Sequence, residues 1–261
     1  PTEIYTLSLH DALPIFDQMR PVQWSTQRIS VPIDRQNFLY GSLEMLPYMK
    51  AIGELPEKLE IEVQPSYRDP AGTEGLRVQD ILIIDILNNN FNTRPIYFAL
   101  STAPSDRLSL ENHLVVEGMA YRVAPVALPQ RGNRYYTNVN TEVTRRHLMD
   151  LRETPDSNRA FGFMFRELNN PDINLDEAST KMIYSFRVAH MGLAQVMLQD
   201  EGNAEGAREV IAQMEKTLPA AYHEFDLTLK TDLSNMYIML RDTAKYREMA
   251  DELEPLYLQK L

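Results

Sequence analysis

Hydrophobic positions in the C-terminal half of the chain recur with the period of an α-helix. Four such stripes begin at Met182, Ala207, Leu229 and Tyr246. Each stripe forms one apolar face of an amphipathic helix. The segments between the stripes are short, which is typical of helices that pair as antiparallel hairpins. The pattern predicts an all-helical domain over residues 135–261.

The spacing of breaks and small residues within these hairpins is typical of tetratricopeptide repeats. Gly202 and Asn203 break the helix, the small Ala207 follows, and Pro219 ends the second helix. A small residue lets the paired helices approach closely, and proline marks the end of a repeat. The next break, at Asp242, comes later than the usual period. The sequence therefore predicts a tetratricopeptide-like domain with one clear unit and a degenerate second one.

The N-terminal half alternates between strand-like and helix-like segments. Leu59–Gln64 alternates apolar and polar residues, which predicts a half-exposed strand. Ile81–Leu87 is apolar except for Asp85 and fits either a buried strand or a buried helix. Asp80 near its start and the asparagines at 88–90 favour a helix of about three turns.

A second helix and strand are predicted directly afterwards. The stretch "IYFAL" after Pro95 has strong strand character. Leu110–Val116 is predicted to be helical, Gly118 ends that helix, and "MAYRVAPV" is predicted to form a strand. These elements form a small mixed α/β layer over residues 59–134. With the helical domain they give an α+β fold class.

Residues 16–58 have no sustained period and are predicted to form an irregular linker next to a membrane. Proline, polar and aromatic residues alternate there without order, and one short strand is expected at Arg28–Val31.

The first fifteen residues are interpreted as an artefact. Written in ordinary codons, "TLSLHDALPI" reproduces the end of a common sequencing adapter, and the three preceding residues extend the match. A signal peptide is the alternative, but the stretch has no basic n-region, and Glu3, His10 and Asp11 interrupt its apolar run. We therefore exclude residues 1–15 from the fold argument.

Charge and composition narrow the class of partner. The formal net charge is −11, with hydrophobic content of 44% and charged content of 24%. An acidic chain lacks the clustered basic face that a nucleic-acid partner requires. The chain contains no cysteine, which removes disulfides and thiolate zinc sites.

Few residue pairs suggest chemistry. His113 and Glu117 would share one face of the expected helix, but no third ligand is evident, so we interpret them as a surface pair and expect no metal. Asp85 lies within an apolar run, and a buried carboxylate needs a partner, so an ion pair with Arg94 is expected. The loop "QRGNRYY", residues 130–136, could bind a sugar or peptide through arginine and tyrosine, but we interpret it as a solvated loop. No phosphate-binding loop or nucleophile elbow is present.

Two central motifs resemble one protein family. The motif residues are Arg94, Pro95, Ile96, Tyr97 and Phe98, followed by Glu117, Gly118, Ala120, Tyr121, Arg122 and Pro125. With the helical tail, they resemble the C-terminal region of the bacterial domain-of-unknown-function 2723 family of multi-spanning membrane proteins. The resemblance covers nearly all of residues 16–261. That family is similar to a eukaryotic protein O-mannosyltransferase, transmembrane protein 260.

The resemblance implies a function for the parent protein and places no catalytic residue in this chain. It implies a membrane glycosyltransferase that uses a polyprenyl-phosphate sugar donor, with its catalytic acid in a region absent here. The chain would be the periplasmic C-terminal domain, which docks the acceptor polypeptide or braces the membrane-spanning portion, and it would need no cofactor.

The alternative is a stand-alone tetratricopeptide-like interaction module. In that case Arg187, His190 and Gln195 would line a concave peptide-binding groove on the first helices.

Overall fold

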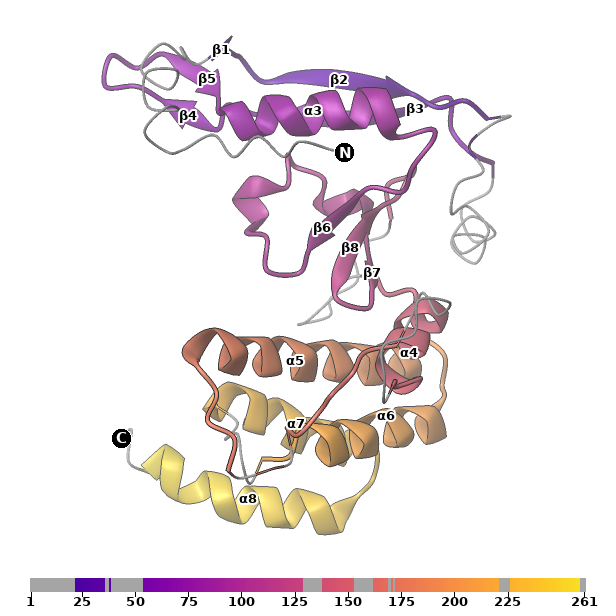
Figure 1. Ribbon diagram of the computed structural model, residues 1–261, viewed down its shortest axis with the longest axis vertical. Helices are drawn as coiled ribbons and strands as arrows, with labels where there is room; N and C mark the ends of the chain where they lie inside the picture. Colours follow the sequence, from indigo (N-terminus) through magenta and orange to yellow (C-terminus); the bar gives the residue numbers. More distant parts are fainter. Residues whose placement is uncertain are drawn as a thin grey trace, which may run out of the picture.

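The computed structural model describes residues 22–35, 38, 54–128, 138–152, 162–168, 170, 172–220 and 226–258. Figure 1 shows strands and one helix at one end of the molecule, a second small sheet in the middle, and a layer of helices at the other end. The arrangement is an α+β fold with a helical C-terminal part, as the sequence predicts.

A two-stranded antiparallel sheet and one helix form the end of the molecule that contains the first strands. Strand β2, Gln27–Pro32, pairs with β3, Lys58–Val63, so that Ile29 lies opposite Ile61. Alternate residues of β3 are buried, because successive side chains of a strand point to opposite faces. Both predicted strands are confirmed. The expected boundary between the linker and the small α/β domain, at residue 58, divides this sheet. Strand β2 belongs to the residues that were assigned to the linker, and it pairs with β3.

Helix α3, Val78–Asn90, packs next to this sheet. A separate three-stranded sheet is formed by short strands, two of which come just before α3 in the sequence. Its strands are β1 (Val22–Gln23), β5 (Glu74–Leu76) and β4 (Tyr67–Arg68), in the order β1-β5-β4. The predicted helix is therefore confirmed. It is only partly buried, because Leu82 and Ile86 are exposed while Leu87 on the opposite side is fully buried.

The middle sheet corrects one prediction. Strands β6 (Tyr97–Ala99), β8 (Ala120–Val123) and β7 (Leu114–Glu117) form an antiparallel sheet in the order β6-β8-β7. The predicted helix at Leu110–Val116 is wrong: a short 3-10 turn, Glu111–His113, leads directly into β7. The run Leu114-Val115-Val116 is short and rich in β-branched side chains, which favour a strand over a helix. Another 3-10 turn spans Pro104–Asp106.

The described residues of the C-terminal part form five helices. They are α4 (Thr141–Met149), α5 (Glu177–Gln199), α6 (Ala204–Thr217), α7 (Leu227–Met239) and α8 (Thr243–Leu258). The first four begin at Asn140, Asp176, Asn203 and Asp226, whose side chains accept a backbone N–H of the first turn. Helix α5 packs against α6, and α7 against α8, so the predicted helical hairpins are present.

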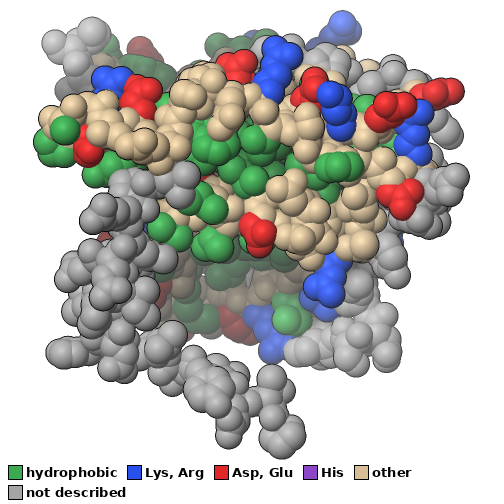
Figure 2. All heavy atoms as spheres, turned by 90° about the horizontal axis from the view of Figure 1, so that it is seen from above, with side chains coloured by type: hydrophobic (Ala, Val, Ile, Leu, Met, Phe, Trp, Pro, Cys, Tyr) green, Lys and Arg blue, Asp and Glu red, His purple; other side chains and the backbone are tan. Residues whose placement is uncertain are grey.

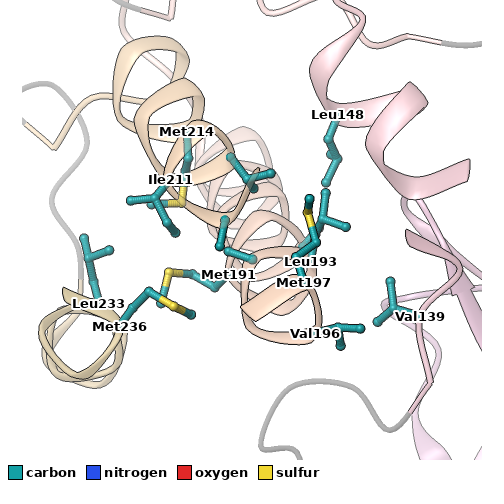
Figure 3. Close-up of a cluster of buried hydrophobic side chains, with 14 of the residues drawn as sticks. Val139, Leu148, Met191, Leu193, Val196, Met197, Ile211, Met214, Leu233 and Met236 are labelled. Carbon is teal, nitrogen blue, oxygen red and sulfur yellow. The ribbon is translucent and has the colours of Figure 1, made fainter. Parts of the chain in front are cut away.

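The helical part has an apolar core rich in methionine. Figure 3 shows Met191, Met197, Met214 and Met236 meeting Leu and Ile side chains from neighbouring helices. Val139 and Leu148 extend this core toward α4. A methionine side chain fills irregular gaps because it is unbranched. Within the described ranges, none of the helices combines the length and apolarity needed to cross a bilayer.

Candidate functional site

The main polar feature of the middle sheet is a buried carboxylate, Glu117, at the end of β7. Tyr97 on β6 lies opposite Arg122 on β8, and Arg122 lies opposite Val115 on β7. Glu117 is two residues after Val115, so its side chain points to the same face of the sheet. The pairing register alone therefore brings Tyr97, Glu117 and Arg122 together.

Glu117 receives three donors. The Tyr97 hydroxyl donates to Oε2 at 2.8 Å, the Asn140 amide Nδ2 donates to Oε1 at 3.0 Å, and Arg122 Nη1 lies 3.5 Å from Oε1. The side chains of Glu117 and Arg122 are only 2% and 4% exposed. A buried charge is tolerated only when it is paired and hydrogen-bonded, and these contacts supply both conditions. The Arg122 guanidinium also lies 5.9 Å from the centre of the Tyr97 ring.

The turn after Glu117 attaches the middle sheet to α4. Gly118 adopts a φ of +66°, and its N–H donates to Thr144 Oγ1 at 3.1 Å. The Thr144 hydroxyl in turn donates to the Val116 carbonyl at 3.2 Å. A Cβ at position 118 would lie 3.2 Å from the His147 side chain. We call Tyr97, Glu117, Gly118, Arg122, Asn140 and Thr144 the junction cluster, because these residues join sheet and helices.

Residues 17–143 match the family model described as TMEM260-associated domain 2. The match covers just under half of the chain and supports a relation to TMEM260-like proteins. The chain matches no curated protein and no solved structure. The matched segment includes both sheet motifs, α3 and the first turn of α4, so most of the junction cluster lies within it.

The remaining motif residues lie away from the carboxylate. Tyr121 is half-buried beneath the Arg107 guanidinium, which lies 4.4 Å from its ring centre, and burial raises the pKa of its hydroxyl. Asp85, Arg94 and Pro95 are exposed. The expected Asp85–Arg94 ion pair is wrong: Asp85 accepts from Asn89 Nδ2 at 2.9 Å, one turn further along α3. The helix turns Asp85 toward solvent, so it needs no buried partner.

His113 and Glu117 do not share a helical face, since they lie in a 3-10 turn and a strand. Nowhere among the described residues do three His, Asp or Glu side chains gather as ligands for a metal ion. The loop at residues 130–136, which we interpret as solvated rather than as a binding site, lies outside the described residues, as do residues 1–15.

Two residues of the predicted peptide groove are in the core, which corrects that prediction. The Arg187 guanidinium donates to the Leu218 carbonyl at 2.9 Å, and burial lowers its pKa to about 10. His190 is fully buried, its Nδ1 lies 2.7 Å from the Phe186 carbonyl, and burial lowers its pKa to about 4. Gln195 is half-buried, and its amide lies 3.4 Å from Gln199 Oε1.

The chain's own aromatic residues fill the face on which that groove was expected. Phe165 meets the Phe186 ring edge-on at 4.8 Å between centroids, and Phe163 meets it at 5.0 Å. Phe165 also lies 6.2 Å from the His190 ring. The segment before α5 therefore packs on α5 where a bound peptide was predicted.

A second polar network was only partly foreseen from the sequence. Asp80 was recognised as a helix-start residue, and the structure shows it buried and bonded to Arg77 Nε at 3.0 Å and to the Ser66 hydroxyl. Burial alone would raise the pKa of Asp80, but the hydrogen bonds from Arg77 and Ser66 outweigh it and hold the pKa below its usual value. Arg77 also pairs with Asp106 at 2.7 Å. An arginine three residues before a helical aspartate is the available sequence signal.

The second network borders a pocket of about 260 Å³ whose lining includes Ser66, Arg77 and Asp80. A second, separate hollow lies in the helical part. A groove of about 430 Å³ runs between α4, α5 and α6, and its charged lining is Glu142, Glu201, Glu205, Glu209 and Arg145. Arg145 lies 3.4 Å from Glu209, and Thr141 donates to Glu201. Glu205 lies 3.6 Å from Arg208, so three of the four lining carboxylates have a partner in the described part of the chain. The arrangement of both networks fixes elements of the fold relative to one another.

Proposed function

We propose that this chain is a non-catalytic, extracytoplasmic C-terminal domain of a multi-spanning, glycosyltransferase-like membrane protein. The parent enzyme would be similar to a protein O-mannosyltransferase and would use a polyprenyl-phosphate sugar donor. The domain would lie on the periplasmic side of the membrane, dock the acceptor polypeptide or brace the membrane-spanning portion, and need no cofactor of its own.

The observation that carries the proposal is the match of residues 17–143 to TMEM260-associated domain 2. That match supports a relation to a membrane protein of the TMEM260 type. The resemblance of the two sheet motifs to the domain-of-unknown-function 2723 family agrees with it and supplies the bacterial setting of the proposal.

The junction cluster supports a bracing role. Glu117 accepts from Tyr97 in the sheet and from Asn140 at the start of α4. A buried, fully hydrogen-bonded carboxylate at such a junction holds two parts of a protein in one orientation. A domain that positions a partner needs this kind of fixed geometry.

The test is to express the complete gene with alkaline phosphatase fused after Leu261, since this reporter is active only in the periplasm. We expect a membrane-bound protein with phosphatase activity. In a second step, deletion of residues 54–258 should abolish mannosyl transfer to an acceptor polypeptide, while the membrane part still binds its sugar donor. A complete gene product that fractionates as soluble protein, or an inactive reporter on a membrane-bound one, would refute the proposal.

A further inference from the structure

The two strands of the β2-β3 sheet have outer edges that differ. Within the described chain this sheet has two strands, so each strand has one edge that its partner leaves uncovered. In an antiparallel pair, residues whose main-chain groups bond across the pair alternate with residues whose main-chain groups point outward. The Ile33 N–H donates to the Glu57 carbonyl at 2.9 Å, which fixes this alternation along the sheet. The outward residues of β3 are therefore Lys58, Glu60 and Glu62.

The outer edge of β2 is blocked by Asn92, which lies just after α3. Asn92 Nδ2 donates to the outward carbonyl of Pro32 at 2.9 Å, and Asn92 Oδ1 accepts the Asp34 N–H at 2.8 Å. Pro32 itself has no N–H to offer to a further strand. Proline and covering residues both prevent pairing at the edge of a sheet. The end of β2 is therefore closed to another strand.

The outer edge of β3 has neither of these features. The strand contains no proline, and none of the described residues bonds the outward N–H and C=O groups of Glu60 and Glu62. A hollow of about 480 Å³ borders this edge. Glu60 and Glu62 line the hollow from the sheet, and Ser109 and Glu111 line it from the segment before β7. The unpaired main-chain groups of β3 thus border open space.

A row of unpaired main-chain groups is complementary to the main chain of another extended segment. When a peptide adds as a strand to such an edge, its main-chain hydrogen bonds supply affinity and its alternate side chains supply specificity. Neighbouring strands lie about 4.8 Å apart, so an added strand would lie in the hollow beside β3. The geometry therefore favours an extended peptide over a compact ligand.

Charge decides which peptide fits this edge. The side chains of Lys58, Glu60 and Glu62 are exposed on one face of β3. Figure 2 looks onto this end of the molecule and shows basic and acidic side chains interspersed along one margin. Opposite charges directly across from each other stabilise a strand pair, and like charges destabilise it. An antiparallel peptide should therefore carry basic residues opposite Glu62 and Glu60, and an acidic residue opposite Lys58.

The contacts that these carboxylates already make leave them accessible. Lys58 Nζ lies 2.7 Å from Glu60 Oε1, and Arg28 on β2 lies opposite Glu62. All four side chains are exposed, and exposed ion pairs contribute little to stability. An incoming basic side chain can therefore share each carboxylate with the cation beside it.

A second copy of the chain fits the same edge less well. In the two antiparallel registers of greatest overlap, Glu60 would face either Glu60 or Glu62 of the other copy. The formal net charge of −11 adds repulsion between copies. The edge therefore favours a segment of a different polypeptide.

We propose that the outer edge of β3 binds, by strand addition, an extended peptide with two basic residues and then one acidic residue at alternate positions. The proposal adds a peptide-docking surface to the proposed function. It does not depend on that function, because this chain should bind the peptide without any membrane-spanning portion.

The test measures the fluorescence anisotropy of a fluorescein-labelled peptide, Thr-Lys-Val-Lys-Val-Asp-Thr, as the natural chain is added. We expect saturable binding. N-methylation of both lysine amides should weaken binding at least about tenfold, because it removes the two N–H donors that would face β3. The matched control carries N-methyl groups on both valine amides, which would point away from β3, and it should bind as the unmodified peptide does.

Reversing two charges on β3 tests which side chains select the peptide. Glu60→Lys combined with Glu62→Lys should weaken binding of the probe at least about tenfold, and the variant should instead bind a peptide with glutamate in place of both lysines. The matched control is Glu248→Lys combined with Glu254→Lys, which changes the net charge equally at exposed positions of α8 and should leave binding unchanged. Circular dichroism checks that both variants are folded, and the methylated peptides decide the question in the natural chain if they are not.

The other outcomes overturn the proposal. A natural chain that does not bind the probe has no strand-addition site for it. Equal weakening by both methylated peptides would show that the main chain of β3 does not pair with the peptide. Equal weakening by both charge variants would show attraction by net charge alone. A dimer in sedimentation that the β3 variant abolishes would identify a second copy as the occupant of this edge.

Discussion

The charge of Glu117 should contribute strongly to stability, because three donors converge on a carboxylate that solvent barely reaches. Glu117→Gln keeps the shape of the side chain and removes the charge. One oxygen is replaced by an NH₂ group, which must then face the Asn140 amide and Arg122, or else the Tyr97 hydroxyl. Facing Asn140 and Arg122, the NH₂ group meets donors only; facing Tyr97, it removes the oxygen to which that hydroxyl donates, so the hydroxyl must turn and accept.

The magnitude follows from the burial. Removing one partner of a buried ion pair costs about 3–5 kcal/mol, because the remaining charge stays buried. The glutamine carbonyl still accepts one hydrogen bond, so we expect a loss of about 3 kcal/mol in the free energy of unfolding at pH 7. The loss should persist in about 1 M salt, which screens exposed charges but reaches buried pairs poorly.

The assay is urea unfolding followed by two probes. Trp24 is the single tryptophan and donates to the Val63 carbonyl at 3.0 Å, so its fluorescence reports on the part that contains β3. Circular dichroism at 222 nm reports mainly on α4 to α8. Since the junction cluster joins these parts, both transitions should coincide in the natural protein and shift together in Glu117→Gln.

The control is Glu62→Gln on the exposed face of β3, which should change stability by less than about 0.5 kcal/mol. A loss below about 1 kcal/mol for Glu117→Gln would refute the claim that the carboxylate is buried and charged. A shift of the fluorescence transition alone would show that the cluster does not couple the sheet to the helices.

Three further predictions concern single residues. Gly118→Ala should lower the free energy of unfolding by about 1–3 kcal/mol, since a Cβ is disfavoured at φ +66° and would crowd His147. Gly72→Ala, at φ +86° in open space, is the control and should cost less. Equal shifts in the melting temperatures of the two variants would contradict the crowding at His147. His190 stays neutral in the folded chain down to pH about 4, whereas the unfolded chain binds a proton near pH 6.5. The free energy of unfolding should therefore decrease by about 3 kcal/mol as the pH is lowered from 6.5 to 4. His190→Gln should remove that part of the pH dependence, and parallel stability–pH curves would contradict it. Arg187→Met leaves the Leu218 and Pro219 carbonyls without this donor and should cost about 1–3 kcal/mol in urea unfolding, whereas a neutral result would show that water replaces the guanidinium.

Local pattern predicted the elements whose faces differ most in polarity. The stripes beginning at Met182 and Ala207 became α5 and α6, and the alternation of Leu59–Gln64 became β3. Each of these elements has one face against the core, so burial imposes its period on the sequence. The α+β class follows from those elements alone.

Pattern failed where the apolar residues form a short continuous run. Leu114–Glu117 is buried along its whole length, so neither period is visible, and the segment was taken for a helix. Its pairing with β8 and the turn at Gly118 decide that it is a strand, and both are contacts beyond the reach of local propensity.

The sequence also named site residues without placing them. Glu117, Tyr97 and Arg122 were selected as motif residues and meet because of strand register, whereas Asn140 and Thr144 joined them unforeseen. Arg187 and His190 were expected on a surface, yet the aromatic segment before α5 buries that face.

The sequence by itself determined the longer helices, the strands β2, β3, β6 and β8, and the acidic, cysteine-free character of the chain. Only the tertiary structure decided which polar residues are buried together and which apolar residues of α3 stay in water. The physical reason is that periodicity records whether a position faces the core of its own element, while partners from distant elements are set by packing and strand register.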